Sequence, residues 1–400
     1  MTAPGPDLTG IIGKLRTLHT ELKLAGDLQQ ELYSSGDGII PLLVSLLRED
    51  GGGTTEVPPE DWARLMGLLA PHAILPLLYY RVASSHSAIP MWAGEHLQAA
   101  YLSSRVQTLR VEKELSDLLG TLEANGVDSL LLKGPALGRT LYTDPVFRPS
   151  GDIDLLVQRE EVPAARDALL SRGFVLPQDD HSVSPSFYDE DTYLPGPGSP
   201  FTVPVELHWE VQRFGRRHRQ ADVGELFERA VPVSTPALTF RTLSPVHALV
   251  YAASHMVLHH WDEVRLIWVK DITLLAASLD TQGWQEVRTE SMRWQSRIAV
   301  EKALTFASLW FGMPKDLSFL ADWPEPSAEE KAIYDGVLHD LHRVRTFLAL
   351  RWPHDAPLAE KIRLLRRLAF NPMGTESPDT VSRRGFTSHV RRWTGMARRL

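Results

Sequence analysis

The stretch RPSGDIDLLV, residues 148–157, places Asp152 and Asp154 at the start of an aliphatic run. Such a run predicts a buried β-strand, whose side chains alternate between two faces. Both carboxylates would then lie on one face, roughly 7 Å apart, with Ile153 and Leu155 pointing into the core. Because two such carboxylates repel each other, their burial is costly unless a cation lies between them. The stretch therefore predicts a cation site at the entrance of a strand.

Two flanking segments supply further candidate groups. VDSLLLKG (127–134) predicts a short buried strand, and PALGRTLY after it predicts a helix with Pro135 in its first turn. The backbone N–H groups at Gly134 could hold phosphate oxygens there, and Arg148, just before the aspartates, could meet a triphosphate. FTVPVELHWEV (201–211) predicts a later strand that carries Glu206 as a third acidic ligand, with Pro204 indicating an edge or a bulge.

The chain has no cysteine, which excludes disulfides, thiolate zinc sites and thiol nucleophiles. Any metal would be held by oxygen or imidazole, which favours Mg²⁺ or Mn²⁺. Two carboxylates at this separation can reach metals about 3.5–4 Å apart, the arrangement used in two-metal phosphoryl and nucleotidyl transfer. A lone Asp-x-Asp also occurs in caps and turns, so this pattern by itself leaves both interpretations open.

Hydrophobic periodicity predicts an α+β chain in which a small mixed β-sheet core is flanked by helical domains. We expect an N-terminal helical region at 1–125 with a linker near 50–59, an α/β core at 126–235, and a C-terminal helical domain at 240–345. Gly126 would end the long helix that precedes the core. Residues 177–200, rich in Asp, Ser, Pro and Gly, predict a long loop or insertion.

Composition and charge restrict the class of protein. An apolar fraction of 43% and a charged fraction of 23% are those of a globular chain. No apolar stretch reaches the roughly 18–20 residues of a membrane span, and the N-terminus lacks the apolar segment of a signal peptide. We therefore expect a cytoplasmic protein with no membrane span.

The net charge of −8 is unevenly distributed, because ten Lys and Arg residues fall within 361–400. This basic, helical tail (346–400) could bind nucleic acid or another anionic surface. Its simpler interpretation is a solvated segment, or one that folds back on the acidic remainder of the chain.

Several motifs in order resemble the DNA polymerase β-like nucleotidyltransferase superfamily. They are LLLKGPALGRTLY, RPSGDIDLLV, a helix ending in SRGF, VELHW, and His255 followed by RLIWVKDI. The upstream APHAILPLLYYRV is similar to the helical lead-in of a bacterial family labelled uncharacterised nucleotidyltransferases. The resemblance covers roughly residues 60–310. It implies a nucleotidyltransferase core in the sheet, and an enzyme that binds ATP or another NTP.

Carried over by motif, the resemblance implies that Asp152 and Asp154 bind metal and that Glu206 is the third catalytic carboxylate. Lys133 and Gly134 occupy the place of the superfamily's Gly-Ser or Gly-Gly turn, which binds phosphate. This is a departure from the pattern, because the serine hydroxyl is missing and Pro135 removes one N–H donor.

Histidines and a lysine downstream are further candidates. His255 and His259 have zinc spacing, but HMVLH lacks the glutamate of a zinc protease motif, so His255 either packs against the core or lines the cleft. His208 shares a strand face with Glu206 and could support the site. Lys270 could contact phosphate, and its alternative interpretation is a solvent-facing lysine beside Asp271.

The sequence therefore leads to one main hypothesis and one alternative. The first is an Mg²⁺- or Mn²⁺-dependent transfer of a nucleoside monophosphate from an NTP to an unidentified small-molecule, peptide or protein acceptor. The alternative is a non-catalytic scaffold of the same fold, or a nucleotide-binding protein, which the altered turn at Lys133–Gly134 favours. The sequence does not identify the acceptor or the base.

Overall fold

The computed structural model describes residues 7–33, 38–48, 57–85, 89–176, 190–211, 221–313 and 317–340. The chain falls into two compact units, one of residues 1–177 with 189–334 and one of 178–188 with 335–400. Only 335–340 of the second unit lie among the described residues, and the basic tail at 346–400 lies outside them. None of the described helices is long and apolar enough to span a bilayer.

A mixed β-sheet forms the centre of the first unit, with strand order β3-β4-β5-β2-β1-β7-β6. Strands β2 and β5 pair in parallel, as do β1 and β7, while the other neighbours are antiparallel. The mixed sheet and the many helices around it confirm that part of the predicted fold class. The strands are β1 (Ser129–Leu132), β2 (Ile153–Val157), β3 (Phe174–Val175), β4 (Glu190–Pro195), β5 (Val205–His208), β6 (Val231–Ser234) and β7 (Thr239–Thr242).

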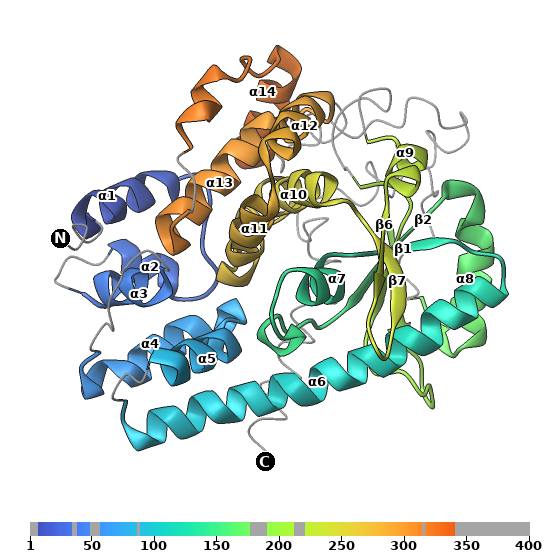
Figure 1. The fold of residues 1–400 in the computed structure, drawn as a ribbon, viewed down its shortest axis with the longest axis horizontal. Helices are drawn as coiled ribbons and strands as arrows, with labels where there is room; N and C mark the ends of the chain where they lie inside the picture. Colours follow the sequence, from blue (N-terminus) through green and yellow to red (C-terminus); the bar gives the residue numbers. More distant parts are fainter. Residues whose placement is uncertain are drawn as a thin grey trace, which may run out of the picture. The chain divides into compact units, whose positions relative to one another are not determined.

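Helices precede, interrupt and follow these strands (Figure 1). Before the sheet lie α1 (Leu8–Leu18), α2 (Leu28–Tyr33), α3 (Ile39–Leu47), α4 (Trp62–Leu69), α5 (Leu75–Ser85) and α6 (Met91–Ala124). Between strands lie α7 (Lys133–Thr140), α8 (Val162–Ser171) and α9 (Val223–Glu228). After the sheet come α10 (Pro245–Ser254), the π-helical turn η6 (His255–His259), α11 (Leu266–Ser278), α12 (Thr281–Arg293), α13 (Arg297–Phe311) and α14 (Ala328–Asp335).

One face of the sheet is covered by α6 and α8, which Figure 1 shows beside the strands. Ile153, Leu155 and Val157 of β2 point to this face and join a buried apolar cluster with residues of both helices. Val205 and Leu207 of β5 point the same way. Since strand side chains alternate, the residues between them face the opposite side, and that side carries the polar groups described below.

The long helix α6 ends as the sequence predicts. Asn125 is its C-cap, and Gly126 has a φ of +72°, the left-handed conformation in which glycine is favoured. The amide of Val127 then donates to the Leu122 carbonyl 3.0 Å away. This stop turns the chain directly into β1.

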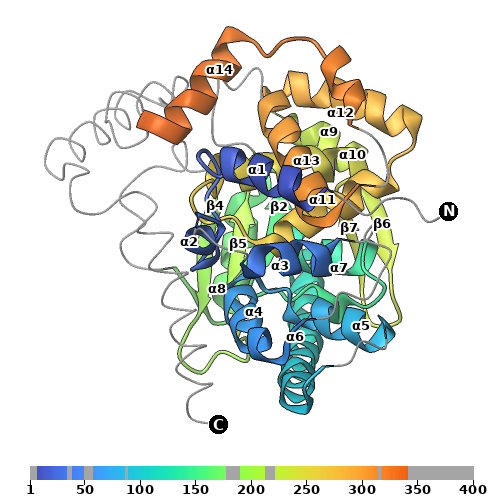
Figure 2. The same cartoon turned by 90° about the vertical axis from the view of Figure 1, so that its left-hand side faces the viewer.

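The N-terminal helices pack on the helices that follow the sheet, and Figure 2 shows α1 and α3 beside α11 and α13. Leu24 forms a parallel bridge with Val264, and the amide of Val264 donates to the Lys23 carbonyl at 2.7 Å. Arg48, which follows α3, donates through Nη1 to the carbonyls of Ser308 and Leu309 near the end of α13. The two helical regions thus share contacts although they are far apart in sequence.

Three sequence expectations about strands are wrong in part. Residues 190–195, within the expected loop at 177–200, form β4, while 177–189 lie outside the described residues. The expected strand at 201–211 is only Val205–His208, and it lies inside the sheet between β4 and β2, with Pro204 ahead of it. Pro204 is tolerated there because it precedes the strand, and its carbonyl accepts a hydrogen bond from Ile153 N at 2.9 Å. The expected strand at Asp152 begins one residue later, at Ile153.

Candidate functional site

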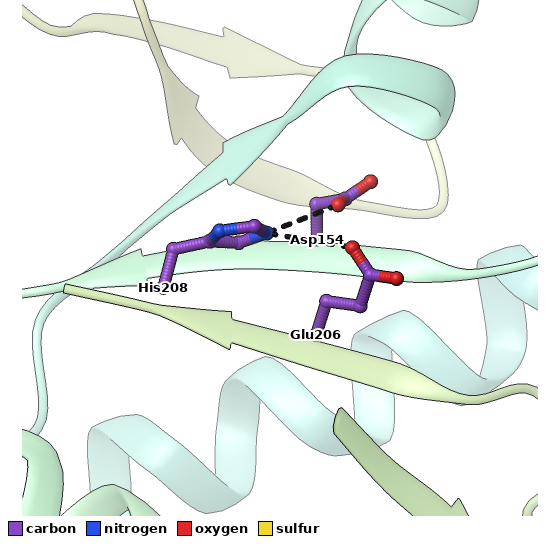
Figure 3. Close-up of side chains that lie close together, drawn as sticks. All are labelled: Asp154, Glu206 and His208. Atoms are coloured by element: carbon purple, nitrogen blue, oxygen red, sulfur yellow. Dashed lines mark hydrogen bonds and ion pairs between the residues drawn. The ribbon is translucent and has the colours of Figure 1, made fainter. Parts of the chain in front are cut away.

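The parallel register of β2 and β5 brings Asp154 and Glu206 side by side. These two residues are direct cross-strand partners, and Leu156 pairs with His208 in the same register. Both carboxylates point away from the α6–α8 face, because Leu155 and Leu207 point into that core. Figure 3 shows Asp154, Glu206 and His208 converging above the two strands. Asp154 is 2% exposed, so its charge requires a compensating partner.

Lys133 supplies that positive charge from the beginning of α7. Its Nζ lies 2.7 Å from Asp154 Oδ1 and 3.7 Å from Glu206 Oε2. Its backbone has a φ of +43°, a left-handed conformation that is unfavourable for a residue with a Cβ. Directly after β1, this turn directs the lysine across β2, since Leu132 pairs with Asp154.

His208 is held between carboxylates on both of its ring nitrogens. Nε2 lies 3.1 Å from Asp154 Oδ1 and 3.6 Å from Glu206 Oε2, while Nδ1 lies 3.0 Å from Glu190 Oε2. Glu190 comes from β4, where it pairs with His208 across the strands. An imidazole with one nitrogen on an outer carboxylate and the other facing candidate ligands is an arrangement common at metal-binding histidines.

The burial of these charges shifts their proton affinities in opposite directions. Burial alone would raise the pKa of Asp154, but Lys133 and His208 outweigh it and hold that pKa below its usual value. Burial, followed by the charge of Asp154, raises the pKa of Glu206. Burial would lower the pKa of His208, but interactions with Tyr251, Asp154 and Glu206 raise it to about 10. Asp154 is therefore the fixed anion, and Glu206 is the carboxylate that takes up a proton more readily.

Asp152 lies one residue before β2, and its predicted role as a metal ligand stays a prediction. It lies in a bend before β2, where the Ser150 hydroxyl donates to its carbonyl and to Oδ1, at 3.1 and 3.2 Å. The paired strand itself starts at Ile153. Burial, followed by the charge of Asp154, raises the pKa of Asp152, so the two carboxylates remain electrostatically linked. The compact set of potential ligands is Asp154, Glu206 and His208.

Gly134 packs tightly against the loop that carries the aspartates. A Cβ at this position would collide with Ser150 Oγ and would lie 3.0 Å from Ser150 Cβ. Arg148 Nη1 would be 3.8 Å from the same point. The absence of a side chain at Gly134 thus allows the first turn of α7 to approach residues 148–150.

Arg148 is bound to an internal partner. Its guanidinium forms an ion pair with Asp271 of α11, with Nη2 at 2.8 Å from Oδ2 and Nε at 2.9 Å from the same oxygen. The Tyr142 hydroxyl donates to Asp271 Oδ1 at 2.8 Å. The remaining nitrogen of the Arg148 guanidinium, Nη1, donates to the Pro149 carbonyl. Arg148 therefore lies near Gly134 with its charge matched by Asp271, and its contact with a triphosphate stays a prediction.

His255 and Lys270 have different surroundings. His255 begins the π-helical turn, and its Nε2 lies 3.3 Å from Lys133 Nζ, so it belongs to the site. Burial, followed by the charge of Lys133, lowers the pKa of His255 well below its usual value and keeps the ring neutral. Lys270 is 2% exposed, with Nζ 5.4 Å from the Phe311 ring centroid in α13. The interpretation of Lys270 as a solvent-facing lysine is wrong.

Several residues of the site were not predicted from the sequence. Glu190 falls within the stretch 177–200 that the sequence predicts as a loop, but it lies in β4. Ser150, Tyr142 and Asp271 reach the site through hydrogen bonds that depend on the tertiary fold. The sequence alone does not indicate a role for Glu190. Its role becomes clear only from the pairing of β4 with β5, which places Glu190 opposite His208.

The donor set of Asp154, Glu206 and His208 fits a divalent cation once Nε2 of His208 has lost its proton. Carboxylate oxygens suit Mg²⁺ and Mn²⁺, and an imidazole ligand shifts the preference toward Mn²⁺ or Zn²⁺. A second acidic group among the described residues, Glu225, His247 and Glu290, has a different character. Arg293 forms ion pairs with both of its glutamates, so this second group is explained as an ion-pair network.

Comparison with known proteins identifies one family that spans the site. The family model described as uncharacterised nucleotidyltransferase matches residues 58–312, more than half of the chain, including every residue of the site. No curated protein matches the chain. Among solved structures, an antigenic nucleotidyltransferase-like protein from Paracoccidioides brasiliensis shows 17% identity over 49% of this chain and 92% of that chain, with a TM-score of 0.29. At this TM-score the likeness supports no conclusion about the present chain.

Proposed function

Because the chain belongs to the family of uncharacterised nucleotidyltransferases, we propose that it transfers a nucleoside monophosphate from an NTP to a hydroxyl or phosphate of an acceptor. We further propose that its sheet belongs to the DNA polymerase β-like superfamily. In such a reaction an acceptor oxygen forms a bond to the α-phosphorus while the bond to the β-phosphate oxygen breaks, and pyrophosphate leaves.

The observation that carries this proposal is the pairing of Asp154 and Glu206 across parallel strands beside Lys133. Two carboxylates in a partly closed site can hold a divalent cation, and a lysine beside them can hold phosphate. Asp154, Glu206 and His208 would hold Mg²⁺ or Mn²⁺, with Asp152 as a further ligand at the edge of the site. When bound, such an ion supplies positive charge to the phosphates and to the attacking and leaving oxygens.

The residues of the chain divide the remaining work. Glu206 accepts the proton of an acceptor hydroxyl, a role in keeping with a pKa that burial and the charge of Asp154 raise. Lys133 and the backbone at Gly134, at the start of α7, bind the β- and γ-phosphates. Glu190 orients the His208 ring through Nδ1. Arg148, bound to Asp271, holds the loop of Asp152 against α7.

The proposal is tested by incubating the protein with each labelled NTP, Mg²⁺ or Mn²⁺, and candidate acceptors from cell extract. We expect mass spectrometry to find an acceptor heavier by one nucleoside monophosphate, with an equal amount of pyrophosphate released. An Asp154→Asn variant should produce neither. Absence of adduct and of pyrophosphate with every NTP and both metals would contradict transfer.

A nucleotide-binding protein of the same fold that does not catalyse transfer is the second candidate. The observation that favours it is the contact of Lys133 Nζ with Asp154, which gives the carboxylate a partner without a metal. This candidate predicts that Mg²⁺–NTP binds to the site and is recovered unchanged. Nucleotide analysis after prolonged incubation separates the two candidates.

A further inference from the structure

The ammonium of Lys133 occupies the position that a bound cation would need. It lies between the two carboxylates that face each other across β2 and β5, 2.7 Å from Asp154 Oδ1 and 3.7 Å from Glu206 Oε2. His208 Nε2 approaches the same Oδ1 at 3.1 Å. Since Oδ1 already has two donors, a metal ion could bind it only after at least one of them leaves.

The surroundings of Lys133 stabilise this placement. His255 Nε2 lies 3.3 Å from Nζ as a hydrogen-bond partner, and the Tyr251 ring centroid lies 5.8 Å from the ammonium. The lysine side chain is 15% exposed, so water replaces these contacts only in part. The ammonium therefore acts as a fixed cation of the site, held there by these contacts.

The backbone of Lys133 indicates that this contact is retained despite a cost. Its φ of +43° lies in the left-handed region, which glycine adopts readily and lysine does not. Residues in such conformations persist where the surrounding structure compensates for them, and they concentrate at functional sites. The side chain of Lys133, unlike a glycine hydrogen, supplies the charge that the carboxylates require.

A triphosphate offers this ammonium another partner. Lys133 is the first residue of α7, whose N-terminal N–H groups favour anions. A triphosphate at this turn would attract the ammonium, and the carboxylates would then be open to a divalent cation. A divalent cation and an ammonium at the same carboxylate oxygen repel each other, so the two compete for Oδ1.

We propose that Lys133 is an internal counter-cation that keeps Asp154 and Glu206 paired until a triphosphate draws it away, so that metal and nucleotide bind as one coupled event. This inference rests on the proposed function, because it concerns the same metal and phosphate subsites. The coupling is reciprocal, as it must be for any two linked ligands. Without a nucleotide the protein would bind divalent cations weakly. When the metal–nucleotide complex binds, Lys133 would move from Asp154 to the phosphates.

The proposal predicts opposite effects of one substitution on two ligands. Lys133→Met keeps much of the side-chain volume but removes the ammonium. It should bind free Mn²⁺ at least tenfold more tightly than the wild type, because nothing competes for Asp154. It should bind the preformed Mn²⁺–inorganic triphosphate complex at least threefold more weakly, because a phosphate contact is lost. A purely structural role for Lys133 would weaken both.

Titration calorimetry with each ligand measures both dissociation constants without any need to know the base or the acceptor. Lys133→Gly is the second variant, because it removes the ammonium and relieves the left-handed strain, and it should repeat the result if Lys133→Met folds poorly. Lys113→Met, at an exposed position of α6, is the matched control and should resemble the wild type. Circular dichroism verifies that each protein is folded.

The outcomes separate this inference from the function on which it rests. Tighter Mn²⁺ binding by folded Lys133 variants, lost again when Asp154→Asn is added, supports the counter-cation. Unchanged or weaker Mn²⁺ binding by those variants, with Asp154→Asn still weakening binding, overturns the counter-cation and leaves the metal site in place. If Asp154→Asn changes the affinity of neither ligand in any background, the metal site itself is wrong and the inference falls with it.

Discussion

His72 shows how strongly single residues depend on their surroundings in this chain. It is fully buried, and its Nδ1 accepts from the Leu266 amide at 3.2 Å, which links the turn after α4 to the start of α11. Burial, followed by the charge of Arg265, lowers the pKa of His72 to about 3. His19, packed edge-on against Phe306, has its pKa lowered by burial to about 4. Both rings are neutral in the folded protein near neutral pH.

These histidines predict a loss of stability in mild acid. Above pH 6.5 both states are neutral and the full stability is present, whereas below it the unfolded chain takes up protons that the buried rings do not. The free energy of unfolding should fall by about 1.4 kcal/mol per pH unit for each histidine as pH decreases from 6.5 toward 4. Urea unfolding between pH 7.5 and 4.5 measures this slope.

His72→Asn should reduce that slope by the contribution of one histidine, about 1.4 kcal/mol per pH unit, whatever its effect on stability at pH 7.5. His96→Asn, at an exposed position of α6, is the control and should leave the slope unchanged. Equal slopes for His72→Asn and the wild type would show that His72 takes up its proton in the folded state as well.

At the residue scale, the sequence predicted which residues lie near the site better than it predicted their bonding partners. Asp154 and Glu206 meet because each lies in a strand whose alternation is legible from its aliphatic neighbours. The expected strand included Asp152 because a bend that is bonded by the Ser150 hydroxyl looks like the start of a strand in sequence. The partner of Arg148, Asp271, lies 123 positions away, so no local pattern could reveal it.

The connection between α6 and β5 decides how the element that carries Glu206 is held. Glu114 of α6 is 6% exposed and accepts three hydrogen bonds from the segment before β5. Its Oε2 accepts from the amides of Thr202 and Val203, each at 3.0 Å, and its Oε1 accepts from the Thr202 hydroxyl at 2.7 Å. One side chain therefore fixes the point at which β5 enters the sheet.

Glu114→Ala should lower the free energy of unfolding by about 2–4 kcal/mol, because amides at the edge of the core lose their acceptor. The nucleotide site should weaken as well, since Glu206 follows this segment. Urea denaturation measures the change. Glu123→Ala, at an exposed position of the same helix, should stay within about 0.5 kcal/mol of the wild type. A similar small change for Glu114→Ala would mean that other contacts position β5.

At the element scale, burial explains which strands were predictable. β2 is buried along its whole length and reads as an uninterrupted aliphatic run. By contrast, β4 contains Glu190 and Asp191, and β6 contains Pro232 and alternates between half-buried and exposed positions. Strands of this composition resemble loops, so the places of β4 beside β5 and of β6 beside β7 become visible only when the sheet is assembled.

At the scale of the first compact unit, the sequence predicted helices around a mixed sheet but not which helices pack together. The amphipathic helices α1 and α3 have apolar faces that many partners could cover. Their packing is specified by details such as the bonds of Arg48 to the end of α13 and the bridge of Leu24 to Val264 before α11. These contacts join positions more than 200 residues apart. Periodicity identifies a buried face, whereas the partner depends on shape and hydrogen bonds.

The account depends on Asp154 and Glu206 acting on one reaction centre, and a double-substitution cycle on pyrophosphate release tests this most directly. The rate is measured with the NTP that supports transfer, for the wild type, Asp154→Asn, Glu206→Gln and the double variant. Groups that act as a unit are strongly non-additive. We expect each single variant to lose at least about a hundredfold in rate, equal to about 2.7 kcal/mol, and the double variant to lose little more. Rates unaffected by either substitution, or losses that multiply in the double variant, would contradict a shared centre.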